Sequence, residues 1–373
     1  MPISRRGAYS NDRRPTEGAP LSHFLTYSLR QLHIEPVLML LLMPIMGFGL
    51  VVLYSASNEN LNQVSRQLVR LTAAVVAMVI VAQISASKLK QIAPAMYTAG
   101  LVMLVGVIFF GYTSGGATRW LDFGAFRFQP SEMMKIAMPL MLAWLLSEDR
   151  LPPNMLRVAA GAALIALPMA LIVVQPDLGT AILIGSSGVF VLFFSGIRWR
   201  WIALSTAVVA AMMPVIWSQM HGYQRQRVLT FMNPEADPLG SGYHIIQSKI
   251  AIGSGGVFGK GWLEGTQSQL DFLPERATDF IFSVACEEFG LLGVFPLLAL
   301  YVAIVLRGLY IAATATDHFS RLLAGSLSLT FCVYVLVNIG MVSGLLPVVG
   351  VPLPLISYGG SSMITIMTAF GLL

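Results

Sequence analysis

The sequence predicts an all-α polytopic membrane protein, with about ten transmembrane helices and one large extracytoplasmic loop between the seventh and eighth of them. Two observations lead to this fold class. Of the 373 residues, 56% are hydrophobic and only 11% are charged, whereas globular domains average about 25% charged residues. Long apolar runs also alternate with short polar breaks, at the length of about 20 residues that a bilayer requires.

The apolar runs place the predicted spans in order along the chain. They fall at 36–55, 70–85, 92–112, 131–147, 155–174, 178–196, 200–218, 279–306, 321–343 and 355–373. Residues 1–33 make a basic cytoplasmic tail that we expect to be disordered, and 34–373 make a single membrane domain in which 219–278 is the large loop. A cytoplasmic N-terminus agrees with the positive-inside rule, because the short inner loops are basic: Lys88, Lys90, Arg150, Arg157, Arg198, Arg200, Arg307 and Arg321.

The net charge of +5 does not indicate nucleic-acid binding, because no run of Lys and Arg is interleaved with aromatic residues. The outer segments of this topology also carry cations, although the positive-inside rule disfavours them there. An anionic ligand on the outer side would explain these cations. They are Arg119, Arg127, Arg225, Arg227, Lys249 and Lys260.

Residues 271–290 carry the strongest functional signal, because a charged strip there runs straight into a membrane-type segment. Asp279 lies at the junction, and Glu287 and Glu288 follow inside the apolar run. Ionisable residues at such positions are costly unless they face a cavity or a partner. We expect Thr278 to cap a helix that starts near Asp279. The Asp279 carboxylate then either stabilises the helix dipole or serves as a general base.

Two other acidic positions lie at the starts of predicted helices. Glu132 and Lys135 follow Pro130, which suits the first turn of a helix, and their spacing of three places them on one helix face. They are either a self-neutralising pair or a cation and a carboxylate that face an aqueous cleft. Asp177, within the run Gln175 to Thr180, either caps the next helix or belongs to the same site.

Glycine and proline mark two irregular stretches. The Gly-rich turns around Lys260 could wrap phosphate with backbone N–H groups, although no P-loop signature is present. Residues 343–362 hold three prolines and several glycines, which predicts a non-helical loop at membrane depth. Irregular backbone at that depth is tolerated only where protein or water covers it. We therefore expect this loop to line the same cavity as the acids.

The sequence shows no Ser-His-Asp or Cys-His arrangement and no histidine cluster. A metal would therefore be a hard cation held by carboxylates and phosphate, such as Mg²⁺ or Mn²⁺. Cys286 and Cys332 lie within apolar runs and have no Cys/His spacing motif around them. We expect them to be small buried hydrophobes rather than a disulfide or metal ligands.

Taken together, these stretches resemble the SEDS family (shape, elongation, division and sporulation), over almost everything after the basic tail. The likeness rests on several long motifs in the family's order. They are Arg119-Trp120-Leu121, Arg127-Phe128-Gln129-Pro130-Ser131-Glu132, Gln175-Pro176-Asp177-Leu178-Gly179-Thr180, Tyr223-Gln224-Arg225-Gln226-Arg227, Gly242-Tyr243-His244-Ile245-Ile246-Gln247-Ser248-Lys249, Phe272-Leu273-Pro274-Glu275-Arg276 and the C-terminal loop from Gly344 to Ser361.

The resemblance implies a peptidoglycan glycosyltransferase of the bacterial inner membrane, with its active site facing the periplasm. Its substrate would be lipid II, a disaccharide-pentapeptide on undecaprenyl pyrophosphate, polymerised into glycan strands during cell elongation. Asp279 matches the family's aspartate, which is taken to deprotonate the acceptor's 4-hydroxyl. That hydroxyl then attacks the donor's anomeric carbon with inversion, and undecaprenyl pyrophosphate leaves.

The resemblance also implies a set of substrate or cavity residues: Arg119, Gln129, Ser131, Glu132, Lys135, Asp177, Gln247 and Lys249. A divalent cation bound with the pyrophosphate is expected, and Asp279 and Glu132 are its candidate protein ligands. One departure concerns Ala277, because the family usually has His before Thr-Asp-Phe. A role for that His in the chemistry is therefore not expected in this chain.

The implied partners are a class B penicillin-binding protein transpeptidase of the elongation type and other elongasome membrane proteins. The alternative from another functional class is a lipid II flippase, and a third is a structural scaffold. A flippase needs a polar path that reaches the inner face, whereas this chain concentrates its non-basic polar residues at the outer face. A scaffold does not require carboxylates entering the spans from several segments.

Overall fold

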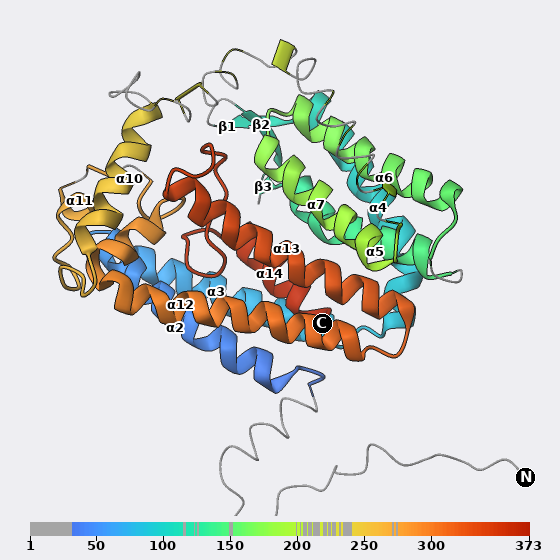
Figure 1. Cartoon of the computed structure of the whole chain (residues 1–373), viewed down its shortest axis with the longest axis horizontal. Helices are drawn as coiled ribbons and strands as arrows, with labels where there is room; N and C mark the ends of the chain where they lie inside the picture. Colours follow the sequence, from blue (N-terminus) through green and yellow to red (C-terminus); the bar gives the residue numbers. More distant parts are fainter. Residues whose placement is uncertain are drawn as a thin grey trace, which may run out of the picture.

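The computed structural model describes residues 32–114, 117–122, 124, 127–148, 152–198, 241–270, 272–273, 275–373 and scattered positions between 200 and 233. Figure 1 shows long helices packed side by side, with a shorter helical region and three small strands toward one end. The helices are α2 (Pro36–Ala56), α3 (Leu61–Ala82), α4 (Ala86–Phe110), α5 (Pro130–Ser147), α6 (Met155–Val174), α7 (Leu178–Phe194), α10 (Ser241–Gly255), α11 (Thr266–Gln269), α12 (Ile281–Thr314), α13 (His318–Val342) and α14 (Ser361–Gly371).

The predicted class of all-α polytopic membrane protein is confirmed. Within the described residues, α2, α3, α4, α6, α12 and α13 are long and apolar enough to cross a membrane. Helices α7 and α14 are shorter apolar helices. The predicted span at 200–218, most of the tail at 1–33, Arg150 and Arg227 fall largely or wholly outside the described residues.

A small sheet was not predicted. Strands β1 (Tyr112–Ser114), β2 (Ala117–Asp122) and β3 (Arg127–Phe128) pair in the order β1-β2-β3, and both pairings are antiparallel. They connect α4 to α5, and Figure 1 shows them beside the end of α7.

Helix boundaries follow local signals where these exist. Helix α6 matches the predicted 155–174, and Pro130 opens α5 as expected. Helix α3 starts at Leu61 instead of residue 70, because the Asn60 side chain accepts from the Gln63 N–H and caps a polar first turn. The last helix starts at Ser361 instead of residue 355. Contacts with other segments hold that stretch in a non-helical path. The Tyr358 N–H donates to the Ala277 carbonyl, and the Pro354 and Ser357 carbonyls accept from the Tyr301 hydroxyl and the Gln67 side-chain amide.

Helix α13 is the central helix of the molecule. In its most apolar window 67% of the residues are buried, whereas the other long spans range from 22% to 39%. Its residues Phe331 and Val335 join a core built with α2, α3 and α12. Its residues Leu322 and Leu327 join a second core built with α4 to α7. The two halves of the bundle therefore meet on α13.

Helix α12 is broken at Gly290, which has φ 60° and ψ −164°. The turn that follows α10 supplies partners for the interrupted backbone. The Leu291 and Leu292 N–H groups donate to carbonyls of residues 256 and 257, both at 3.0 Å, and the Glu287 and Glu288 carbonyls accept from residues 260 and 261. A break inside an apolar span is tolerated when neighbouring protein satisfies the freed groups in this way. A Cβ at position 290 would lie 2.2 Å from the Gly259 nitrogen, so glycine is required.

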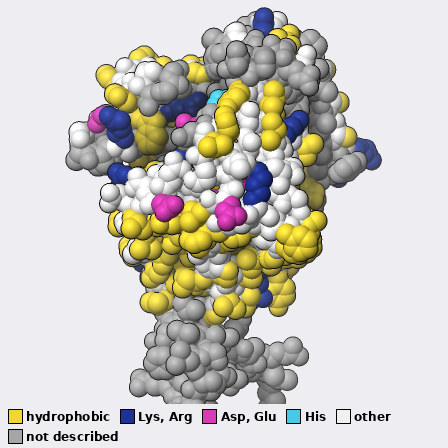
Figure 2. Space-filling view, turned by 90° about the vertical axis from the view of Figure 1, so that its left-hand side faces the viewer, with side chains coloured by type: hydrophobic (Ala, Val, Ile, Leu, Met, Phe, Trp, Pro, Cys, Tyr) yellow, Lys and Arg dark blue, Asp and Glu magenta, His cyan; other side chains and the backbone are white. Residues whose placement is uncertain are grey.

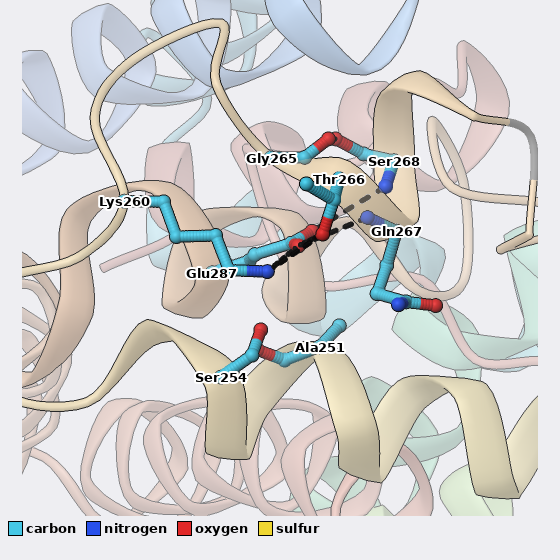
Figure 3. A network of polar contacts seen from close by, with 8 residues as sticks. All are labelled: Ala251, Ser254, Lys260, Gly265, Thr266, Gln267, Ser268 and Glu287. Carbon is cyan, nitrogen blue, oxygen red and sulfur yellow. Dashed lines mark hydrogen bonds and ion pairs between the residues drawn. The ribbon is translucent and has the colours of Figure 1, made fainter.

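Side chains reinforce the same junction (Figure 3). The fully buried Glu287 carboxylate pairs with the Lys260 ammonium at 2.7 Å. Its two oxygens also accept from the Thr266 hydroxyl and from the N–H groups of Gln267 and Ser268, at distances from 2.9 to 3.3 Å. Glu287 therefore fixes α11 and the Lys260 turn onto the broken helix.

Candidate active site

Asp279 lies in the turn that precedes α12. The helix begins at Ile281, and its cap residue is Phe280, which makes no side-chain capping bond. The expected cap by Thr278 is wrong, because the Thr278 hydroxyl donates to the Glu275 carboxylate at 2.8 Å instead. Asp279 is thus held outside the helix, on a turn with its own supports.

Three contacts fix the backbone of this turn. The Asn338 side-chain amide of α13 donates to the Asp279 carbonyl at 2.9 Å and to the Val351 carbonyl at 2.7 Å. The Ser357 hydroxyl donates to the Thr278 carbonyl at 2.6 Å. The Tyr358 N–H donates to the Ala277 carbonyl at 2.8 Å. The C-terminal loop, residues 343–360, is therefore hydrogen-bonded to the turn that carries Asp279.

A cavity of about 210 Å³ lies at this turn. Its lining residues are Thr230, His244, Ile245, Glu275, Asp279, Phe280 and Val348. Val348 belongs to the C-terminal loop, so the loop lines the Asp279 cavity as expected. Figure 2 shows basic, acidic and histidine side chains around a hollow in the upper part of this face, with hydrophobic side chains dominating lower down.

Helix α10 forms another wall of this cavity and is fixed in place by a buried serine. The Ser248 hydroxyl lies 2.7 Å from the Ser283 hydroxyl of α12 and donates to the Val342 carbonyl of α13 at 2.5 Å. The same helix carries the predicted residues Gln247 and Lys249, and neither of them lines the cavity. Lys249 is exposed and lies against Gly344 at the start of the C-terminal loop.

The predicted pair of Glu132 and Lys135 is present as a buried ion pair on α5. The ammonium lies 2.7 Å from Glu132 Oε1, and both side chains are less than 10% exposed. The ammonium also lies 5.3 Å from the ring centroid of Tyr334 on α13. Glu132 Oε2 is buried and has no hydrogen-bond partner. Ser131 is buried beside the pair, and Gln129 precedes the helix without a side-chain cap.

Asp177 caps α7, which is one of the two alternatives that the sequence offered for this residue. Its Oδ1 accepts from the Thr180 N–H at 3.2 Å. Its Oδ2 also lies 3.4 Å from Arg119 of β2, and Arg119 donates to the Pro176 carbonyl at 2.7 Å. A Cβ at Gly179 would lie 2.9 Å from the Val349 carbonyl, so this end of α7 also packs against the C-terminal loop.

The C-terminal loop therefore lies between two acidic positions. Gly350 faces Asp279, since a Cβ there would lie 3.5 Å from Asp279 Oδ2. The adjacent Val349 packs against the start of α7, where Asp177 and Arg119 are paired. The structure thus places Asp279 and the Asp177–Arg119 pair beside this loop, and Lys249 lies against its start. Glu132 and Lys135 form a separate site, where Lys135 lines another pocket together with Tyr334.

Some of the outer cations already have protein partners. Arg127 lies 3.2 Å from Asp122 and stacks over the Tyr112 ring at 4.2 Å. The Gly124 N–H and the Arg127 guanidinium hold the pKa of the Asp122 carboxyl below its usual range. Arg225 donates to the carbonyls of Trp217 and Ser218. These two arginines serve local structure, and Arg119 and Lys260 are likewise paired, with Asp177 and Glu287. Lys249, exposed beside the C-terminal loop, is therefore the strongest candidate among these outer cations for binding an anion.

Four residues of these sites were not among the predicted ones: His244, Glu275, Tyr334 and Asn338. The sequence did contain a signal for Asn338. A polar amide within an apolar span is expected to pair with another polar group or to face a cavity. Glu275 and His244 lie in motifs that the sequence displays, but nothing local indicates that they share a cavity with Asp279. That proximity is created by the packing of α10 on α12.

The described residues contain no group of three or more His, Cys, Asp or Glu side chains that could hold a metal ion. Mg²⁺ is usually bound through only one or two carboxylates together with substrate phosphates. Asp279 and Glu275 line one cavity and fit that role. Glu132 is engaged with Lys135 and is not among the residues that line this cavity. Cys286 and Cys332 are free thiols.

We expect Asn338→Ala to lower the free energy of unfolding by about 1–3 kcal/mol, because the buried Val351 carbonyl and the partly buried Asp279 carbonyl lose this donor. Thermal or denaturant unfolding in detergent measures this effect. Ser343→Ala is the control, since within the part of the chain that the structure describes the Ser343 hydroxyl bonds only carbonyls of α13. Equal stability of the two variants would show that the Asn338 bridge contributes nothing.

The fold and these polar sites define a multi-pass membrane protein with acids gathered around an irregular loop. Residues 36–373 match the family model described as FtsW/RodA/SpoVE, cell cycle protein. The chain therefore belongs to the FtsW/RodA/SpoVE family.

Individual relatives are similar over nearly the whole chain. The chain is 52% identical over 343 residues to the peptidoglycan glycosyltransferase MrdB of Escherichia coli strain K12, covering 92% of this chain and 93% of the relative. A solved structure described as a peptidoglycan synthase complex that coordinates polymerization and crosslinking aligns with a TM-score of 0.79 at 31% identity, covering 91% of this chain and 96% of that one. The crystal structure of Thermus thermophilus rod shape determining protein RodA aligns with a TM-score of 0.69 at 28% identity, covering 91% and 95%.

Proposed function

We propose that this chain is a peptidoglycan glycosyltransferase that polymerises lipid II into glycan strands. The observation that carries the proposal is Asp279, an acid on a braced turn at the wall of a cavity, in a chain 52% identical to a glycosyltransferase of that class. An ionisable residue at the end of a membrane span is energetically costly, so a functional role is the default hypothesis for it.

In the proposed reaction, the Asp279 carboxylate accepts the proton of the acceptor sugar's 4-hydroxyl. The oxygen so activated attacks the anomeric carbon of the donor and forms the new glycosidic bond. The bond from that carbon to the pyrophosphate oxygen breaks with inversion, and undecaprenyl pyrophosphate leaves as an anion. Pyrophosphate is already a good leaving group, so the reaction requires a base and cationic stabilisation more than a strong acid.

The cations for the leaving pyrophosphate are proposed to come from Arg119, Lys135 and Lys249. Lys249 supports this role through its exposure next to the C-terminal loop. The proposed substrate-binding set also includes five polar residues: Gln129, Ser131, Glu132, Asp177 and Gln247. A divalent cation such as Mg²⁺ or Mn²⁺, bound with the pyrophosphate and held by Asp279 and Glu275, would neutralise developing charge on the phosphates.

The proposed setting is the inner membrane of a bacterium, with the Asp279 cavity facing the periplasm. The proposed partner is a class B penicillin-binding protein of the elongation type, together with other elongasome membrane proteins. The similarity to a chain of a synthase complex that coordinates polymerization and crosslinking supports a crosslinking partner.

Purified protein and fluorescent lipid II test the proposal, with and without the partner transpeptidase and Mn²⁺. Gel separation should show glycan polymers. A parallel experiment with lipid II confined to one leaflet of a vesicle tests the flippase alternative. Transport of lipid II across the vesicle, with no polymer under any of these conditions, would replace the polymerase by a transporter.

A further inference from the structure

His244 is the residue of the Asp279 cavity that lacks an explanation. It lies on α10 and lines the same cavity as Asp279 and Glu275. Its ring stacks on Phe280, the residue next to Asp279, with the ring centroids 5.9 Å apart and the planes 18° from parallel. The imidazole is therefore held in a fixed orientation beside the proposed base.

The polar atoms of this imidazole are not used by the protein. Among the described residues no hydrogen bond reaches the His244 imidazole, and its Nδ1 is buried without a partner. Because Nδ1 is closed off from solvent, a ligand in the cavity would contact Nε2 on the other edge of the ring, which can donate or accept a hydrogen bond.

The size of the cavity limits what it can enclose. Pockets that enclose a whole drug-sized ligand usually measure about 300–1,000 Å³, and this cavity measures about 210 Å³. It suits one sugar ring better than a disaccharide with its peptide. The lining fits a sugar as well, because it combines two carboxylates and an imidazole with the apolar side chains of Ile245, Phe280 and Val348.

We propose that His244 is a substrate-contacting residue, whose Nε2 forms a hydrogen bond with the terminal amino sugar of the acceptor strand while Asp279 receives that sugar's hydroxyl proton. The inference rests on the proposed function and assigns the Asp279 cavity to the acceptor. Stacking on Phe280 fixes the ring, so little side-chain freedom is lost when the sugar binds. His244 positions the acceptor and takes no proton in the reaction.

Two variants separate the ring from its nitrogen. His244→Phe keeps an aromatic ring against Phe280 and removes both nitrogens. His244→Gln places an amide near the position of Nε2 and removes the ring. Loss of one hydrogen bond to substrate corresponds to a change of about tenfold in affinity. We expect His244→Phe to raise the KM for lipid II about tenfold while kcat changes less than threefold, and His244→Gln to stay within about threefold of wild type in both constants.

Direct binding of lipid II to the full chain tests the role of His244 without relying on polymerase activity, which tests the proposed function. It is measured by fluorescence in the Asp279→Asn background, in which turnover is blocked. The Phe variant should bind about tenfold more weakly than that background, and the Gln variant should not. Wild-type kinetics and binding in His244→Phe, with unchanged thermal unfolding, would overturn the inference and leave the polymerase intact. If the wild-type chain neither binds nor polymerises lipid II, the proposed function fails and the inference fails with it.

Discussion

Replacing Asp279 by asparagine should reduce polymerisation of lipid II by at least about 100-fold, because a positioned general base contributes roughly 10²–10⁴ to a rate. The asparagine side chain has nearly the same shape, so the supports of the turn from Asn338, Ser357 and Tyr358 should remain. Binding of lipid II and assembly with the partner should therefore persist. Initial rates of polymer formation from purified lipid II, together with a binding measurement, check this expectation.

The matched control is Asp122→Asn, which makes the same chemical change in an outer carboxylate that is paired with Arg127 on the β2–β3 turn. Asp122 does not line the Asp279 cavity, so its variant should polymerise at a rate close to wild type. A folded Asp279→Asn protein with a normal rate would remove Asp279 from the chemistry and leave only its structural position.

The second large effect concerns stability. Glu287→Ala should lower the free energy of unfolding by about 3–5 kcal/mol, the range for breaking a buried ion pair by removing one partner. The change leaves the Lys260 ammonium without its carboxylate partner. It also removes the acceptor for the two backbone N–H groups of Gln267 and Ser268 in α11. Glu287→Gln should lose less, because its carbonyl oxygen still accepts. Thermal unfolding in detergent compares the three proteins.

Glu264→Ala serves as the control for this prediction, since Glu264 is an exposed carboxylate in the same turn. Its removal should change stability by no more than about 0.5 kcal/mol. If Glu287→Ala and Glu264→Ala unfold at the same temperature, the buried Glu287 network contributes nothing to stability. The turn is then held by its backbone hydrogen bonds alone.

Local chemistry made parts of this fold predictable. Pro130 starts α5, Asp177 caps α7, and the spacing of Glu132 and Lys135 brings them together on one face. Each of these signals acts within one or two helical turns. The apolar runs gave the long helices for the same reason, because a bilayer requires a continuous run of a certain length.

What could not be predicted depends on contacts between distant segments. Asn338 links a turn at residue 279 to a loop at residue 351, and no pattern near any of these positions encodes that link. The pairing of Arg119 with Asp177 likewise depends on how close β2 comes to the start of α7. The expected cap by Thr278 failed because Glu275 offered its hydroxyl another acceptor in the folded turn.

The broken helix α12 has a consequence for how this part of the sequence can change. The turn at 256–261 reaches the break at Gly290 through backbone bonds, so its length is fixed. Its glycines are fixed as well: a Cβ at Gly259 would lie 2.1 Å from a backbone carbonyl, and Gly256 and Gly261 have positive φ values. Lys260 is held by its ion pair with Glu287. Across related sequences, substitutions in this turn should therefore be confined to the exposed positions 257 and 258, and insertions or deletions should be absent from it.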